Sequence, residues 1–214
     1  MENTVEKKKI VLSAIQPTGT ITLGNYLGAV RNWVTMQNEY NCIYALADLH
    51  TITVRQTPAV MRKNILDAYA SIMACGIDVE HTALFMQSDV LEHCNLGFLI
   101  AFQCGVGELS RMTQYKDKTA KIGNNESIPT GIYIYPTLMA ADILLYDPDY
   151  IPVGVDQKQH VELTRDLAIR FNSRYSDTFK IVEPVTAKTG AKINSLANPN
   201  KKMSKSESDK GTIY

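Results

Sequence analysis

The sequence has few features of a secreted, membrane-spanning or metal-rich protein. It contains only four cysteines, Cys42, Cys75, Cys94 and Cys104, and no two of them form a CxxC pair. This pattern favours buried thiols in a reducing compartment over disulfides or a zinc site. No apolar run is long enough to span a bilayer, and the short apolar stretch after Lys7–Lys9 is too short for the core of a signal peptide. We therefore expect a cytoplasmic protein without membrane segments.

The sequence also lacks net charge, because 22 basic residues balance 22 acidic ones. No broad basic field indicates a nucleic acid partner, so any contact with RNA must be local. The composition is otherwise that of a globular protein, with 45% hydrophobic and 21% charged residues. Its length predicts a single domain over residues 1–214, built around one sizeable core.

The most informative stretch is 9–37. An apolar run at Ile10–Ile15 predicts a buried strand, a loop with proline, glycine and threonine follows at 16–22, and helical spacing comes next. A helix start leaves unpaired N–H groups and the positive end of the helix dipole facing such a loop. The unit is therefore a candidate phosphate site, although most strand–loop–helix units in α/β proteins bind nothing.

Strand and helix patterns continue to alternate along the chain. Strands are predicted at Cys42–Ala47 and Thr82–Met86, with a helix at Pro58–Cys75 between them. This order predicts a parallel sheet with right-handed crossovers. A further strand at Tyr150–Val153 precedes a long helix, for which Asp156 is the expected N-cap.

The region between these units is predicted to be mostly helical. Helical spacing covers Glu92–Gln114, and its segment Gly105–Ser110 resembles a GxGxxG dinucleotide loop. That segment has serine in place of the third glycine and follows a helix instead of a strand, so we do not interpret it as a dinucleotide site. The basic and polar stretch Lys116–Asn125 is expected to be a loop.

An isolated carboxylate marks the next helix, Tyr135–Tyr146, which Pro136 is expected to open. Asp142 is the exception in an otherwise apolar segment. Burying a carboxylate costs free energy unless it meets donors, so Asp142 should pair with a core partner or face a ligand. Met139 lies three residues earlier on the same helical face.

Two motifs about a domain apart carry a resemblance to a known family. Pro17–Asn25 (PTGTITLGN) resembles the HIGH region of class I aminoacyl-tRNA synthetases, with Thr22–Asn25 in place of His-Ile-Gly-His. Lys202–Ser206 (KMSKS) is the second class I signature, letter for letter. The chain as a whole is similar to the catalytic domain of bacterial tryptophanyl-tRNA synthetases, most clearly at 16–28, 108–114, 138–146, 156–168 and 201–206.

This resemblance implies a Rossmann-type, doubly wound parallel sheet, with a connecting insertion at about 92–135 and a KMSKS loop at 201–208. It also implies a homodimer that activates L-tryptophan with ATP and then charges tRNA(Trp). Mg²⁺ would be held mainly by the ATP phosphates, with no metal site made by the protein. The chain stops eight residues after Ser206, without the family's C-terminal helical region for the anticodon, so a catalytic-domain portion is expected.

The family's site residues can be placed on this sequence position by position. The ATP-binding set corresponds to Gln16, Pro17, Thr18, Gly24, Asn25, Gly154, Val155, Asp156, Ile193, Lys202, Met203, Ser204, Lys205 and Ser206. The tryptophan-binding set corresponds to Gln16, His50, Tyr135, Met139, Asp142, Ile151, Val153 and Gln157. Asp142 would accept the indole N–H, which can only donate. Lys202 and Lys205, with Lys118 as a further candidate, would stabilise charge on the departing pyrophosphate.

Other interpretations stay open at this point. A tyrosyl-tRNA synthetase shares the fold and chemistry, although the wording LMAADILLY favours tryptophan. A non-catalytic protein derived from a synthetase, and a nucleotidyltransferase acting on another acceptor, are further alternatives. Ala14 stands where the family usually has glycine, and its methyl group is expected to narrow the pocket. His50 and His160 could be ordinary hydrogen-bonded core histidines, and for His160 we prefer that interpretation.

Overall fold

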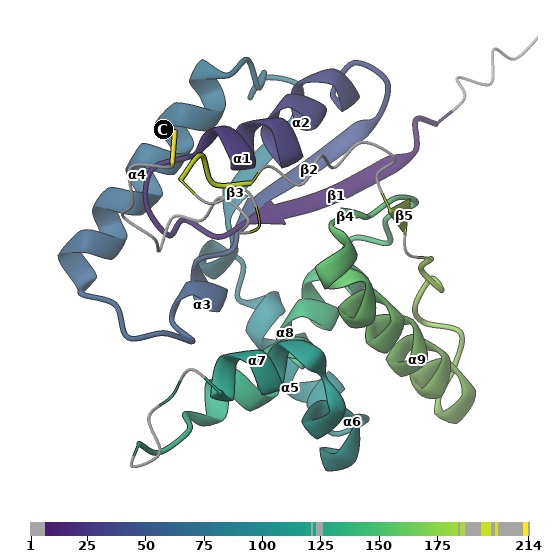
Figure 1. Ribbon diagram of the computed structural model, residues 1–214. Coiled ribbons are helices and arrows are strands. Elements are labelled where there is room, and N and C mark those ends of the chain that lie inside the picture. Colours follow the sequence, from purple (N-terminus) through teal and green to yellow (C-terminus); the bar gives the residue numbers. More distant parts are fainter. Residues whose placement is uncertain are drawn as a thin grey trace, which may run out of the picture.

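A parallel β-sheet with helices on both faces forms the centre of the molecule (Figure 1). The computed structural model describes residues 7–120, 122, 126–183, 185–186, 194–197, 200 and 212–213. Strands β1 (Ile10–Ile15), β2 (Asn41–Leu46) and β3 (Ala83–Met86) pair in parallel in the order β1-β2-β3. The strand–helix–strand pattern of the sequence is therefore confirmed, and the bounds of β1 are those predicted.

A second parallel pair, β4 (Pro152–Val153) and β5 (Val185–Thr186), continues the sheet beyond β1. The connection is a backbone bridge between Val11 and Tyr150, in which Leu12 N donates to Tyr150 O at 3.1 Å. Counted through this bridge, the strands lie in the order β3-β2-β1-β4-β5. The first strands are added on one side of β1 and the later ones on its other side, so the switch point lies next to β1. Ligands of doubly wound sheets bind at such a switch point.

The first helical segment consists of α1 (Leu23–Asn25), a π-helical turn η1 (Tyr26–Val30) and α2 (Arg31–Met36). Thr22 and Asn25 cap its start reciprocally. Thr22 N donates to Asn25 Oδ1 at 3.2 Å, and Asn25 N donates to Thr22 Oγ1 at 3.3 Å. Two residues of the first signature therefore fix the point where the chain turns into the helix.

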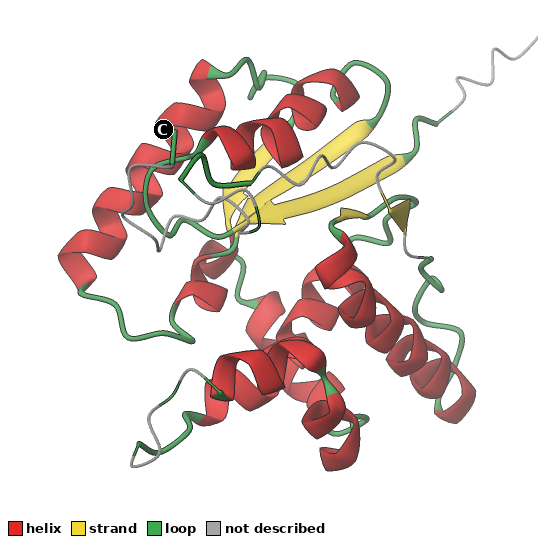
Figure 2. Ribbon diagram, in the orientation of Figure 1, coloured by secondary structure: helices red, strands yellow, loops and turns green. Residues whose placement is uncertain are grey.

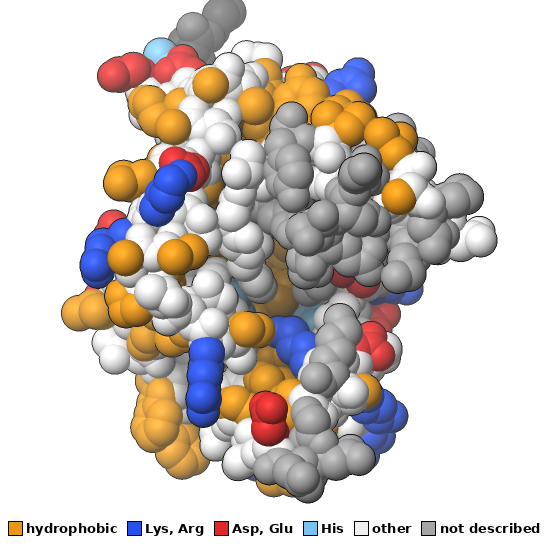
Figure 3. Space-filling model, turned by 60° about the vertical axis from the view of Figure 1, so that its left-hand side comes forward, with side chains coloured by type: hydrophobic (Ala, Val, Ile, Leu, Met, Phe, Trp, Pro, Cys, Tyr) orange, Lys and Arg blue, Asp and Glu red, His pale blue; other side chains and the backbone are white. Residues whose placement is uncertain are grey.

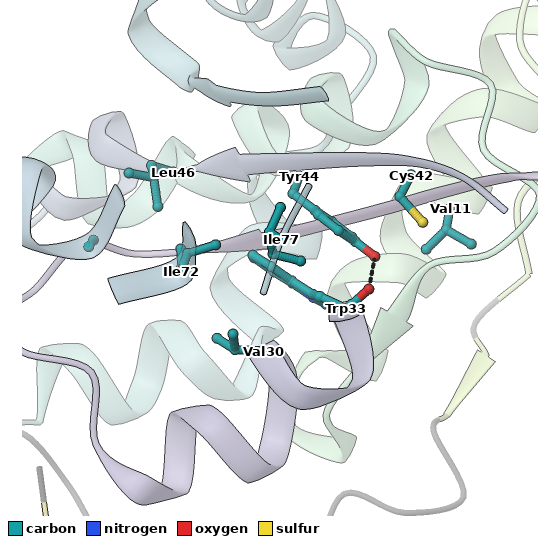
Figure 4. Close-up of a cluster of buried hydrophobic side chains, with 9 residues drawn as sticks. Val11, Val30, Trp33, Cys42, Tyr44, Leu46, Ile72 and Ile77 are labelled. Carbon is teal, nitrogen blue, oxygen red and sulfur yellow. Dashed lines mark hydrogen bonds between the residues drawn. The ribbon is translucent and has the colours of Figure 1, made fainter. Parts of the chain in front are cut away.

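One face of the sheet packs against α2 and α4 (Pro58–Ala74) through a core of nine buried residues (Figure 4). In that core the rings of Trp33 and Tyr44 stack with centroids 4.3 Å apart, and Tyr44 OH donates to Trp33 O at 3.0 Å. Val11 of β1 points into this core, whereas its neighbour Leu12 points to the opposite face. This alternation along β1 lets one strand bury side chains in two layers.

The opposite face is covered by a separate group of helices (Figure 2). It comprises α5 (Glu92–Ala101), α6 (Val106–Arg111), α7 (Thr113–Thr119), α8 (Thr130–Leu144) and α9 (Lys158–Arg174). Helices α5, α6, α8 and α9 share a buried apolar cluster, and α8 and α9 also pack on Leu12. Short elements α3 (Asp48–Thr51), η2 (Gln87–Asp89) and η3 (Val155–Gln157) follow β2, β3 and β4.

Helix α7 covers part of a stretch that the sequence analysis assigned to a loop. Thr113–Thr119 is helical, so the expected loop Lys116–Asn125 is wrong over its first residues. The helix forms because Tyr115 packs on the apolar cluster and its ring meets Tyr133 at 5.2 Å, while Thr113 N donates to Gln159 Oε1 at 2.9 Å.

Two expected helix starts are also wrong. Helix α8 begins at Thr130, so Pro136 lies inside it and does not open it. Burial of Ile132 and Tyr135 in the first turns outweighs the backbone hydrogen bond that a proline removes. The N-cap of α9 is Gln157 instead of Asp156, because a 3₁₀ turn precedes the helix. By contrast, the prediction that Gly105–Ser110 follows a helix instead of a strand is confirmed, because Gly105 is the N-cap of α6 and α5 precedes it.

Candidate active site

A cavity of about 500 Å³ lies where the strands β1, β2, β3 and β4 end at the switch point. Figure 3 shows a hollow in the molecule with hydrophobic side chains inside it and basic side chains beside it. Its walls come from Ser13–Gln16 at the end of β1, from residues after β2 and β3, and from the inner face of α8. The architecture therefore brings together side chains that are more than a hundred residues apart in the sequence.

Asp142 on α8 lies at one end of the cavity and is surrounded by donors. His50 Nε2 lies 2.7 Å from Asp142 Oδ2, and His93 Nδ1 lies 2.7 Å from Oδ1. Gln87 Nε2 lies 2.7 and 2.8 Å from the two oxygens. The expected pairing of Asp142 with core partners is thus confirmed, because three polar residues from other elements converge on it.

These contacts fix the charge of the Asp142 carboxylate. Burial acts to raise its pKa, but the hydrogen bonds from His50 and His93 outweigh burial and hold the pKa below its usual range. The side chain of Asp142 keeps 16% of its surface exposed, compared with 1% for His93. An ionised acceptor that is still accessible from the cavity is suited to receive one more N–H donor.

A second polar pair lies about two turns earlier along α8. The hydroxyl of Tyr135 lies 2.8 Å from His160 Nε2, and both residues are buried. Burial raises the pKa of Tyr135 to about 12, and burial also lowers the pKa of His160 to about 4, helped by nearby His50 and Lys118. The preferred interpretation of His160 as a hydrogen-bonded core histidine is confirmed.

Lys118 brings a positive charge to the same wall. Its Nζ lies 4.0 Å from the centroid of the Tyr135 ring, a cation–π geometry, and Lys118 lines the cavity from α7. Between Tyr135 and Asp142 the wall is apolar, with Met139, Ile151 and Val153. The cavity therefore combines an apolar middle with a carboxylate at one end and a tyrosine with a cation at the other.

The other side of the cavity is lined by backbone-rich and amide-bearing positions. Gln16, Asn25 and Gly28 come from the first strand–loop–helix unit, and Asp156 and Gln157 come from η3. Gly154 also lines it, and a Cβ there would lie only 2.6 Å from Asp156 Oδ1. Any side chain at position 154 would therefore require the Asp156 carboxylate to move.

The structure places the expected tryptophan-binding residues together, since all of them line the cavity: Gln16, His50, Tyr135, Met139, Asp142, Ile151, Val153 and Gln157. Of the expected ATP-binding residues, Gln16, Asn25, Gly154 and Asp156 line it. Pro17, Thr18 and Gly24 do not line it, and Pro17 is buried. The Val155 side chain, Ile193 and Lys202–Ser206 lie outside the described residues. Ala14 also lines the cavity. The narrowing of the cavity by its methyl group stays a prediction.

Sequence reasoning missed Gln87, His93 and Tyr146, which complete the surroundings of Asp142. A signal for Gln87 was available. Polar residues directly after a parallel strand collect at one edge of the sheet, and Gln87 follows β3 as His50 follows β2. His93 had no such signal, because it opens a helix that reaches the site only through packing against α8.

The described residues contain no group of three or more His, Cys, Asp or Glu side chains that could hold a metal ion. Within the same ranges, no helix is both long and apolar enough to cross a bilayer. All four cysteines are free thiols.

Comparison with known proteins gives close relatives. A family model described as tRNA synthetases class I (W and Y) matches residues 4–214. A tryptophan–tRNA ligase of Clostridium tetani (strain Massachusetts / E88) is 54% identical over 208 residues, which are 97% of this chain and 61% of the relative.

Solved structures agree. A crystal structure of tryptophanyl-tRNA synthetase from Mycoplasma pneumoniae superposes with a TM-score of 0.91 at 44% identity, over 97% of this chain and 61% of that one. The Campylobacter jejuni enzyme, complexed with ADP and tryptophan, gives 0.84 at 36% identity, over 92% and 60%. The chain thus spans about 61% of the length of its relatives. Because the family match extends over nearly the whole sequence and coincides with a doubly wound sheet whose switch point holds the cavity, the chain belongs to the class I tRNA synthetases for tryptophan and tyrosine.

Proposed function

We propose that this chain is the catalytic portion of a tryptophan–tRNA ligase. It activates L-tryptophan with ATP to give tryptophanyl-adenylate and pyrophosphate, and the tryptophanyl group is then transferred to tRNA(Trp). The observation that carries the proposal is the ionised, accessible carboxylate of Asp142 at the end of an apolar-walled cavity in this family's fold.

Tryptophan fits the cavity by the chemistry of its two ends. The indole N–H is a donor without acceptor capacity, and it would meet Asp142 after the ring enters between Met139 and Val153. The α-amino group would meet the polar side chains Tyr135, Gln157 and Gln16 at the other end. The relative complexed with ADP and tryptophan supports this pairing of ligands for the site.

ATP would occupy the side formed by the first signature and η3. The reaction is attack of the tryptophan carboxylate on the α-phosphorus, and it requires no protein nucleophile. Catalysis would come from alignment of the two substrates and from positive charge near the leaving pyrophosphate. Lys118 lines the cavity, and Lys202 and Lys205 belong to KMSKS, outside the described residues. The segment after KMSKS is tied to the first signature, because Leu23 N donates to Ile213 O at 2.9 Å.

Mg²⁺ would arrive with ATP and be held mainly by its phosphates. The side chains that line the cavity fit this arrangement. Asp142 is already engaged by His50, His93 and Gln87, and the described residues form no metal-binding cluster. Asp156 lines the cavity and is the described carboxylate best placed to contact the ion's water shell. The ion would supply charge neutralisation of the phosphates.

The assembly and location that we propose are a homodimer in the cytoplasm. Helix α5 presents large apolar side chains to solvent, with Leu91 just before it 70% exposed, Phe98 67% and Phe102 69%. Rings of this size at such exposure suit an interface with a second copy. Sedimentation of the protein and of Phe98→Glu would test this, and a monomeric parent chain would contradict it.

Amino-acid-dependent exchange between ATP and labelled pyrophosphate tests the function. We expect exchange with L-tryptophan and none above background with L-tyrosine. Exchange with tyrosine alone would establish the tyrosine alternative instead. No exchange with any amino acid, in protein that is folded and binds ATP, would favour a non-catalytic binding protein or a nucleotidyltransferase with another acceptor.

A further inference from the structure

A linear chain of hydrogen bonds leads away from the cavity behind Asp142. His93, at the start of α5, places Nδ1 2.7 Å from Asp142 Oδ1 and Nε2 2.8 Å from the hydroxyl of Tyr146. His93 is 1% exposed, and Tyr146 extends from the end of α8. The sequence motifs indicated no role for either residue.

The order of donors in this chain follows from chemistry. An ionised carboxylate only accepts, so Nδ1 of His93 must carry the proton that points to Asp142. In the neutral ring, Nε2 then accepts, and Tyr146 must donate its hydroxyl proton to it. Burial, and next the charge of Asp142, raise the pKa of Tyr146 to about 12, so that hydroxyl keeps its proton. The Asp142 carboxylate therefore selects the Nδ1–H tautomer of His93, and the Tyr146 hydroxyl holds the ring at its far nitrogen.

Packing leaves His93 little freedom to leave this position. Its ring lies against Phe85 of β3, with centroids 5.9 Å apart, and against the ring of Tyr146 at 5.5 Å. One turn further along α5, Gly97 lets the helix approach α8 closely, because a Cβ there would lie 3.3 Å from Leu138 Cα. The backbone contact of α5 with α8 thus determines how near His93 comes to Asp142.

We propose that His93, held at its far nitrogen by Tyr146, is a positioning residue that holds the Asp142 carboxylate in the orientation that receives the indole N–H. This proposal rests on the proposed function. His50 and Gln87 contact the same carboxylate, but they do so from the short elements α3 and η2 that follow strands. Gln87 Oε1 accepts from the backbone N–H of Leu49 at 3.2 Å, whereas the far nitrogen of His93 meets a second side chain, the hydroxyl of Tyr146 just after α8.

Loss of this support should act on tryptophan and spare ATP. Without the N–H of His93, the Asp142 carboxylate can rotate. Its two oxygens then accept from His50 and Gln87 in a different orientation. We expect His93→Leu to weaken tryptophan binding by about ten- to a hundredfold. His93→Asn retains an N–H donor close to the position of Nδ1, and it should recover most of that loss. Tyr146→Phe should give a smaller loss, of about three- to tenfold, because His93 then lacks the hydrogen bond that holds its far nitrogen.

Calorimetric titration of each variant with tryptophan and with ATP measures these changes. His81→Leu is the matched control, because His81 also pairs with an aspartate but is exposed at the surface. Unchanged tryptophan affinity in His93→Leu, or an equal loss in His93→Leu and His93→Asn, would overturn the role of His93. If the parent chain itself fails to bind tryptophan, the proposed function fails and not merely the role of His93.

A spectroscopic measurement separates positioning from general structural support. In protein labelled with ¹⁵N-histidine, long-range ¹H–¹⁵N spectra distinguish the two neutral tautomers of each ring. We expect His93 in the Nδ1–H form in the parent chain, as donation to Asp142 requires, and in Tyr146→Phe as well. An Nε2–H tautomer in the parent chain would overturn the proposal even if every variant folds and binds less tryptophan.

Discussion

The hydroxyl of Tyr135 lies 2.8 Å from Nε2 of His160, and this contact joins α8 to α9 directly behind the cavity. It resembles the contact between Asp142 and His93 at the other end of the same face of α8. In both cases a histidine that is 1% exposed supports a polar group that lines the cavity. Polar side chains of α8 that line the cavity are thus fixed from behind by the neighbouring helices.

Burial of His160 makes the stability of the fold depend on pH. Its pKa is about 4 in the folded chain and 6.5 when unperturbed, so between these values the unfolded chain binds more protons. Stability should therefore be fully present above about pH 6.5 and decrease as the pH falls toward 4. The expected loss from this group between about pH 7.5 and pH 5 is on the order of 2 kcal/mol. Urea unfolding at both pH values measures it.

His160→Gln should remove this part of the pH dependence, although it lowers stability overall. His81→Gln is the control, because it also removes one histidine, but an exposed one. Equal pH dependence in the parent chain and in His160→Gln would show that His160 titrates normally in the folded protein.

Asp142→Asn tests the carboxylate itself. The change replaces an acceptor that meets three donor residues by an amide, whose NH₂ group would face His50, Gln87 or His93. Tryptophan binding should weaken by about 1 to 3 kcal/mol, with ATP binding nearly unchanged. Asp67→Asn, at an exposed position of α4, is the control. Unaltered tryptophan affinity in calorimetry would assign Asp142 a structural role only.

Tyr44→Phe tests the packing of the sheet on α2. The hydroxyl of Tyr44 is fully buried and donates to Trp33 O, while Gln37 N donates to the same carbonyl at 3.1 Å. Because the carbonyl keeps one donor, the loss should be modest, about 1 kcal/mol of unfolding free energy. Fluorescence of Trp33, the only tryptophan in the sequence, follows the unfolding. Tyr40→Phe, four residues earlier, should change stability less.

The sequence allowed good prediction wherever a local pattern decides the structure. The apolar run of β1 has a strand period and neighbouring turn residues, so its bounds were correct. The start of α8 was missed because proline usually opens a helix, and only burial of the preceding turn explains why this helix begins earlier. The donors around Asp142 could not be predicted, since α5 and β3 reach it only through tertiary packing.

The last prediction concerns Lys118, whose Nζ lies over the Tyr135 ring at 4.0 Å and on the wall of the cavity. A cation held on a short helix is preorganised, so its contact with the leaving pyrophosphate should be strongest as charge develops there. Lys118→Met keeps the apolar stem and removes the charge. We expect adenylate formation to slow by about 10² to 10³, with tryptophan affinity changed less than tenfold.

Lys116→Met, at an exposed lysine of the same helix, is the matched control and should keep the parent rate. Single-turnover rates of adenylate formation, measured together with equilibrium tryptophan binding, test this prediction. A parallel loss of both quantities in Lys118→Met would assign the lysine to ground-state packing on Tyr135 and exclude it from transition-state stabilisation.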